Sequence, residues 1–179
     1  MTKTCFDIIT WEEIVLKNRK ISDKINFAIR NSVKSYKLSK SDSDLVCGKE
    51  TDYSRRTKFK VLYAKNNIVS YYLESDTYYK GILHDLHQLN TLNFDATTGE
   101  SISFYNLINP TKISNIDSMI LRKINFEKGS NRVDSSELEN KEFTVQDNGI
   151  TIFYWYENYP MKVTLTYKEL KPFIAKSGF

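Results

Sequence analysis

Residues 143–174 constrain the fold more than any other stretch, because their local signals agree on a three-stranded antiparallel meander. Phe143 and Val145 alternate with polar neighbours, which is the pattern of a strand with one buried face. Asp147-Asn148-Gly149 follows, where Asn and Gly accept the positive φ of a tight hairpin turn. A return strand then begins at Ile150, so this segment predicts a hairpin that continues into a third strand.

The second strand of the meander, ITIFYWY, carries large apolar side chains on both faces. Ile152 and Tyr154 share one face, whereas Phe153 and Trp155 point to the other. A strand with two apolar faces needs cover on both sides, so we expect a central strand in which Trp155 is a buried core residue. The third strand alternates apolar and polar residues and is expected nearer to an edge.

Helical periodicity appears twice in the chain. Apolar residues recur at three- and four-residue steps near 21–36 and near 113–127, which predicts two amphipathic helices. Two β-rich runs on either side of an Asn-Asn pair predict a hairpin over 58–73. With the meander at 142–168, these elements predict an α+β fold: an antiparallel sheet of meander and hairpins packed by two helices. A length of 179 residues fits a single domain, 1–179.

The charge and the aromatic content of the chain limit the classes of partner that we expect. The 26 basic and 22 acidic residues leave a net charge of +4, too balanced for a phosphate-binding face without clustering. The basic run 55–60 is interpreted as a solvated strand start, so we expect no nucleic-acid partner. No apolar run approaches the roughly 18 residues of a membrane span, and no membrane insertion is expected. The 12 Tyr and 10 Phe favour strands and contact surfaces.

Metal or acid–base chemistry has one starting point in this sequence, the pair His84 and His87. A metal site needs further ligands, and no Cys-x-x-Cys or His-Glu-x-x-His spacing supplies them. No glycine-rich phosphate loop occurs either. We therefore expect no catalytic residue, no metal and no cofactor, and an enzyme built on the two histidines is the weaker alternative.

The sequence allows two hypotheses for Cys5 and Cys47. They can form a disulfide in an oxidising compartment, or they can be two reduced and unrelated thiols. The N-terminal residues MTKTCFDIITWEEI place acidic residues where a signal peptide has its apolar core. A cytoplasmic location is expected if Met1 is the native start, and a periplasmic or extracytoplasmic location if a signal peptide was removed.

Several short segments carry a family resemblance together. They are Asn67-Ile68-Val69-Ser70, Thr77-Tyr78-Tyr79-Lys80-Gly81, the turn Asn93 to Glu100, and the terminal GITIFYWYENYP with VTLTYKELKPFI. From about Ser22 onward the chain resembles a bacterial domain family of largely unknown function. That family forms the extracytoplasmic part of the anti-sigma factor RsiV and the accessory domain of the peptidoglycan deacetylase PdaC. The resemblance implies an antiparallel sheet packed by helices, and the RsiV member binds lysozyme as a protein ligand.

The candidate partner-binding residues are aromatic and acidic side chains in loops and short segments outside the expected core. They are Tyr78, Tyr79, His84, Asp134, Glu137, Glu139 and Glu142. The leading hypothesis is a non-enzymatic immunity or inhibitor protein, which neutralises a bacterial toxin enzyme, a nuclease or cell-wall hydrolase, by occluding its active site. The alternative is an extracytoplasmic envelope module that binds lysozyme or peptidoglycan.

Overall fold

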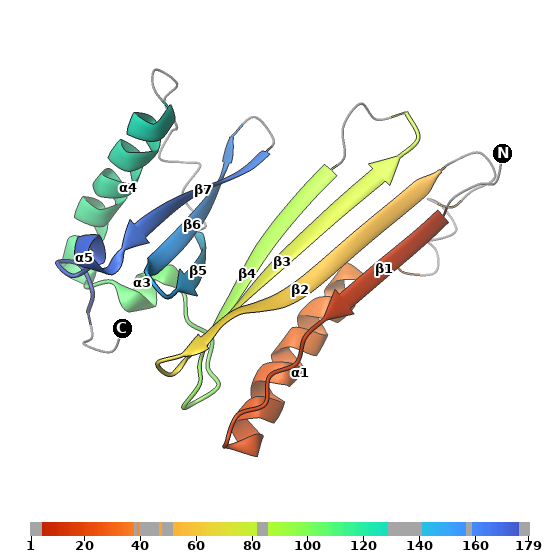
Figure 1. The fold of residues 1–179 in the computed structure, drawn as a ribbon, viewed down its shortest axis with the longest axis horizontal. Coiled ribbons are helices and arrows are strands. Elements are labelled where there is room, and N and C mark those ends of the chain that lie inside the picture. The colour runs from red at the N-terminus through yellow and green to blue at the C-terminus, as the bar shows by residue number, and fades with distance from the viewer. Residues whose placement is uncertain are drawn as a thin grey trace. The chain divides into compact units, whose positions relative to one another are not determined.

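The computed structural model describes residues 5–37, 39, 47, 52–81, 86–128, 141–156 and 159–175 (Figure 1). Its elements are, in chain order, β1 (Cys5–Trp11), α1 (Arg19–Tyr36), β2 (Tyr53–Lys65), β3 (Ile68–Tyr79), β4 (Leu86–Asp95), α3 (Phe104–Leu107), the 3-10 helix η1 (Pro110–Lys112), α4 (Ile113–Lys128), β5 (Glu142–Gln146), β6 (Gly149–Tyr156), β7 (Tyr159–Thr166) and α5 (Tyr167–Leu170).

The strands form two sheets, one with the order β1-β2-β3-β4 and one with the order β5-β6-β7. Mostly antiparallel sheets combined with helices confirm the predicted α+β class, the hairpin and the meander. The sequence did not predict the pairing of β1, which runs parallel to β2 in a continuous register from Cys5 opposite Tyr53 to Trp11 opposite Phe59. Helix α1 provides the crossover between these parallel strands.

By their contacts the residues divide into two compact units. Unit 1 consists of Met1–Val61 and Tyr72–Asn90, and unit 2 consists of Leu62–Tyr71 and Thr91–Phe179. The strands β2, β3 and β4 contribute residues to both units. A single domain over residues 1–179 stays a prediction.

In unit 1, α1 lies along one face of the sheet (Figure 1). Asn18 caps the helix by accepting the Lys20 N–H at 3.1 Å, and this cap starts the helix slightly before the predicted position. Ile25, Ile29 and Val33, spaced four residues apart, form its buried face. Near the end of the helix, the Tyr36 ring meets the Phe59 ring of β2 edge-on, with centroids 5.7 Å apart.

In unit 2, one face of the meander forms the core. The strand registers place these apolar residues on that face: Phe143, Val145, Ile150, Ile152, Val163 and Leu165. Helix α4 covers them with Ile116, Ile120 and Ile124, which are fully buried. The helix predicted near 113–127 therefore exists and supplies three of the buried residues of this core.

The opposite face of the meander is lined by threonine near its centre. Thr144 lies opposite Thr151, which lies opposite Thr164, and the Oγ1 atoms of Thr151 and Thr164 are 2.9 Å apart. Trp155 shares this face but lies at the end of β6, opposite Pro160, and is 40% exposed. β6 is the central strand as predicted, but the expectation that Trp155 is a core residue is wrong.

Candidate functional site

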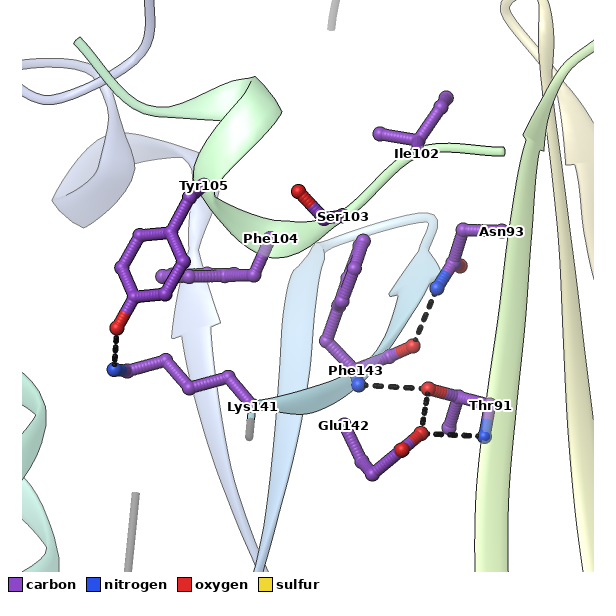
Figure 2. Close-up of a pocket in the computed structure, with 9 residues that line it drawn as sticks. All are labelled: Thr91, Asn93, Ile102, Ser103, Phe104, Tyr105, Lys141, Glu142 and Phe143. Atoms are coloured by element: carbon purple, nitrogen blue, oxygen red, sulfur yellow. Dashed lines mark hydrogen bonds between the residues drawn. The ribbon is translucent and has the colours of Figure 1, made fainter. Parts of the chain in front are cut away.

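A cavity of about 250 Å³ lies in unit 2, where the end of β4, the start of α3 and the start of β5 meet (Figure 2). Its lining residues are Thr91, Asn93, Ile102, Ser103, Phe104, Tyr105, Lys141, Glu142 and Phe143. Both aromatic rings and polar side chains line this cavity, and three features of the sequence position them.

The first feature is a capping box at the start of α3. The Ser103 hydroxyl accepts the Asn106 N–H, and the Asn106 side chain accepts the Ser103 N–H at 2.8 Å. The short helix that follows directs Phe104 into the core, where its ring meets the Phe143 ring at 5.8 Å. The polar atoms of Ser103 are thus used to fix the helix start.

The second feature is the buried ammonium of Lys141, whose side chain is only 2% exposed. Its Nζ donates to the Tyr105 hydroxyl and lies 3.0 Å from Asp117 Oδ1. It also lies 4.7 Å from the Tyr105 ring centroid and 5.9 Å from that of Phe104. Burying an ammonium is costly unless such partners replace its water shell. We infer that Lys141 anchors the chain at the entry to β5.

The third feature is a set of side chains that cover the free edge of β5. Glu142 Oε2 accepts the backbone N–H and the hydroxyl of Thr91, both at 2.6 Å, and Thr91 Oγ1 accepts the Phe143 N–H at 2.9 Å. Figure 2 shows Glu142 pointing toward Thr91, whereas Lys141 points toward Tyr105. The carboxylate of Glu142 thereby ties β4 to β5 through charge-assisted hydrogen bonds.

The cover continues along β5. The Asn93 amide donates to the Phe143 carbonyl at 2.8 Å, and the Val145 N–H donates to Ser70 Oγ at 3.1 Å. Ser70 Oγ donates to Asn93 Oδ1, which links the two side chains. We call Ser70, Thr91, Asn93 and Glu142 the β5 clasp. It satisfies backbone groups that an edge strand would otherwise leave open to pairing.

The predicted partner-binding residues are distributed unevenly in the structure. Tyr78 is 40% exposed, whereas Tyr79 is half-buried against Tyr53, with ring centroids 5.4 Å apart. Glu142 is half-buried within the clasp. The remaining predicted residues, His84, Asp134, Glu137 and Glu139, lie outside the described residues.

Of the residues that line the cavity, sequence reasoning named Glu142 as a candidate site residue and missed the others. Thr91, Asn93 and Lys141 are isolated polar residues with no motif spacing, and their roles depend on partners far away in the chain. The Ser103-x-x-Asn106 spacing resembles the capping boxes that are read from sequence, and it was the one available signal.

The polar atoms around the cavity mainly bond to one another, so the arrangement is suited to holding strands together and to presenting ring surface. Among the described residues, no group of three His, Cys, Asp or Glu is placed to hold a metal ion. His87 Nδ1 lies 2.7 Å from Asp76 Oδ1 in unit 1. In the part of the chain that the structure describes, no helix is long and apolar enough to cross a membrane.

Cys5 and Cys47 are joined by a disulfide, with Cα atoms 5.7 Å apart and a sequence separation of 42. The bond ties the start of β1 to the connection between α1 and β2. Of the two hypotheses that the sequence allowed, a disulfide or two unrelated thiols, the structure shows the disulfide.

The arrangement defines an α+β protein with a four-stranded sheet, a three-stranded meander and helices packed against them. No protein-family model matches the sequence, and no curated protein matches it. Among solved structures, a DUF3298 family protein from Pseudomonas aeruginosa PAO1 is similar, with a TM-score of 0.64 and 13% identity over 96% of this chain and 86% of that one.

A DUF3298 family member from Bacteroides fragilis NCTC 9343 is also similar, with a TM-score of 0.55 and 12% identity over 88% of this chain. The present chain covers 65% of that protein. At these identities the likeness shows the fold, which is therefore similar to that of DUF3298 proteins, a bacterial family of unknown function.

Proposed function

We propose that the chain is a non-enzymatic protein-binding domain that works in an oxidising compartment of the cell envelope. Its proposed partner is a cell-wall hydrolase of the lysozyme type, whose active site it would occlude. The Cys5–Cys47 disulfide carries the choice of compartment, because such bonds persist outside the reducing cytoplasm. For the same reason, an envelope module is better supported than a cytoplasmic toxin inhibitor.

Support for protein binding comes from the face of the unit 1 sheet turned away from α1. Phe59 contacts α1, so side chains one step along β2 and their β1 neighbours point the other way. The Thr57 and Ser75 hydroxyls bond on the α1 side, which assigns alternate β3 residues to the opposite face. The residues on this open face include Phe6, Ile8, Arg56, Lys58, Lys60, Tyr72, Glu74, Asp76, Tyr78 and His87.

The open face combines apolar, aromatic and charged groups. Ile8 is 49% exposed and Tyr78 is 40% exposed. The Arg56 guanidinium lies 5.4 Å from the Phe6 ring centroid. Such mixtures of aromatic residues and arginine are enriched at protein interfaces.

Charges on the open face form two stripes. Arg56, Lys58 and Lys60 follow β2, whereas Glu74 and Asp76 follow β3. An acidic stripe beside a basic one repels a phosphate backbone but complements the mixed charges of a protein surface. This pattern supports a protein partner over a nucleic acid.

The experiment has two arms. The chain is first recovered from its native cells under alkylating conditions, and intact mass is expected to show one disulfide and no alkylated thiol. Hen egg-white lysozyme and purified peptidoglycan sacculi are then used as binding probes. We expect lysozyme binding with inhibition of wall hydrolysis, and we expect Tyr78→Ala to weaken it at least about tenfold as a central aromatic contact.

Phe27→Ala is the matched control, because Phe27 is 61% exposed on α1 and lies away from the open face. Two alkylated thiols in the native protein would refute the compartment. Binding to sacculi alone, or to neither probe, would refute the proposed partner.

A further inference from the structure

The outer edge of β1 carries backbone groups that point away from its sheet. Among the described strands, β1 is at one end of the order β1-β2-β3-β4 and pairs with β2 (Figure 1). The Glu12 N–H donates to the Phe59 carbonyl at 3.2 Å, which fixes the direction of the backbone groups along the strand. Because these directions alternate, the N–H and C=O groups of Asp7, Ile9 and Trp11 point outward.

The strand itself, Cys5–Trp11, carries none of the sequence features that usually protect a sheet edge against pairing. Natural edge strands are guarded by lysine, proline, a bulge or very short length. β1 is seven residues long, contains neither lysine nor proline, and keeps an unbroken register with β2. Its one charged side chain, Asp7, is neutralised within the chain by Arg55, at 2.9 and 2.7 Å. Ile8 and Trp11 are 49% and 42% exposed.

We propose that β1 pairs antiparallel with β1 of a second copy of the chain, about a two-fold axis at Ile8. The register of the two β1 strands follows from which backbone N–H and C=O groups point outward. Antiparallel strands exchange hydrogen bonds between residues whose backbone groups face each other, which here are the odd-numbered ones. A two-fold axis at Ile8 pairs Asp7 with Ile9 of the second copy and Cys5 with Trp11, so that the whole strand is used.

Charge and packing favour this register and this occupant. An axis at Asp7 would set two carboxylates opposite each other, whereas an axis at Ile8 sets each carboxylate opposite an isoleucine. Ile8 then meets Ile8 of the second copy as a close non-hydrogen-bonded pair, and Phe6 meets Thr10 on the same face. The surface is thus complementary to itself, as a two-fold symmetric interface requires.

The proposal is independent of the function proposed above. It joins the sheets of two chains and would place the open faces of both unit 1 sheets side by side, with Ile8 at the junction. A failure of lysozyme binding would leave it standing.

The test begins with sedimentation velocity of the intact protein over a concentration series. Wild type is expected to show a reversible monomer–dimer equilibrium. Ile8→Lys and Ile8→Glu are each expected to weaken dimerisation at least about tenfold, because like charges then face each other across the axis. An equimolar mixture of the two variants is expected to restore the dimer as a Lys–Glu cross-strand pair.

Phe27→Lys is the matched control, since it places the same charge at a residue that is 61% exposed but belongs to α1 and not to β1. Its dimerisation is expected to equal that of wild type. Circular dichroism and thermal melting check that every variant remains folded, which is expected because Ile8 is half exposed.

Amide hydrogen exchange gives a readout specific to the strand edge. Protection at Asp7, Ile9 and Trp11 should rise with protein concentration, whereas protection at Ile8 should not, because its N–H already points to β2. A monomeric wild type, a dimer unaffected by Ile8→Lys, or a variant mixture that stays monomeric would each overturn the proposal. A monomer whose β1 pairs with a strand of another protein would overturn it as well.

Discussion

Asn93→Ala tests the β5 clasp most directly. Asn93 is 4% exposed and bridges two buried groups, the Phe143 carbonyl and the Ser70 hydroxyl. Truncation removes both hydrogen bonds and leaves each group without that partner. An unsatisfied buried group costs about 1–3 kcal/mol, so we expect the free energy of unfolding to fall by about 2–4 kcal/mol, with partial relief if water enters.

The measurement is urea denaturation followed by circular dichroism at 25 °C, with an unchanged m-value showing that stability alone has changed. In a chain of this size the same loss lowers Tm by about 5–15 °C. Asn115→Ala is the control, because Asn115 is exposed on α4, and its effect should stay within about 0.5 kcal/mol.

A double-mutant cycle locates the effect. Ser70→Ala removes the other end of the Asn93–Ser70 hydrogen bond, so the loss in the double variant should be smaller than the sum of the two single losses. Additive losses, or a loss below about 0.5 kcal/mol for Asn93→Ala, would show that the clasp does not stabilise the β5 edge.

Three further changes probe other parts of unit 2. Ile120→Ala leaves a cavity at a fully buried position on α4, so urea unfolding should show a free energy of unfolding lower by about 2–5 kcal/mol. A smaller loss would mean that the core collapses into the cavity. Gly149→Ala places a Cβ 2.0 Å from the Leu165 carbonyl oxygen, so a loss of about 1–3 kcal/mol is expected, and neutrality in thermal melting would refute the tight approach. The hydrogen bond from Lys123, followed by the backbone N–H of the helix cap, lowers the pKa of Glu169 to about 2. Its stabilisation is therefore present above the unfolded pKa of about 4.3 and is lost as pH falls toward 2. Because the side chain is 37% exposed, the effect should be about 1 kcal/mol, and equal acid sensitivity in Glu169→Gln would contradict it.

The elements that sequence reasoning predicted correctly are those with local signals. The Asn66-Asn67 pair adopts positive φ values of 49° and 58°, as a tight hairpin turn requires, and its two strands follow directly on either side. The four-residue spacing of Ile25, Ile29 and Val33 fixed the buried face of α1. These patterns are complete within a dozen or so residues, so no distant partner is needed to read them.

The parts that escaped prediction depend on distant partners. The hydrogen bond between Val145 and Ser70 joins residues 75 positions apart, and that between Phe143 and Asn93 joins residues 50 positions apart. No local sequence pattern therefore predicts the clasp. The prediction for Trp155 was wrong because we inferred burial from its apolar side chain alone. Trp155 lies at the end of β6, where its side chain is 40% exposed. The parallel pairing of β1 likewise depends on the crossover through α1, which a strand pattern alone does not specify.

The sequence separation of the clasp has a consequence for the order of folding. The meander joins neighbouring strands and can form quickly, whereas the clasp must close loops of 50 to 75 residues. During synthesis Ser70 and Asn93 emerge before β5 is made, so the strand meets its edge partners as it appears. In refolding from denaturant, the meander instead forms with a bare β5 edge. We therefore expect less aggregation when the chain folds during synthesis than when it refolds after dilution from urea.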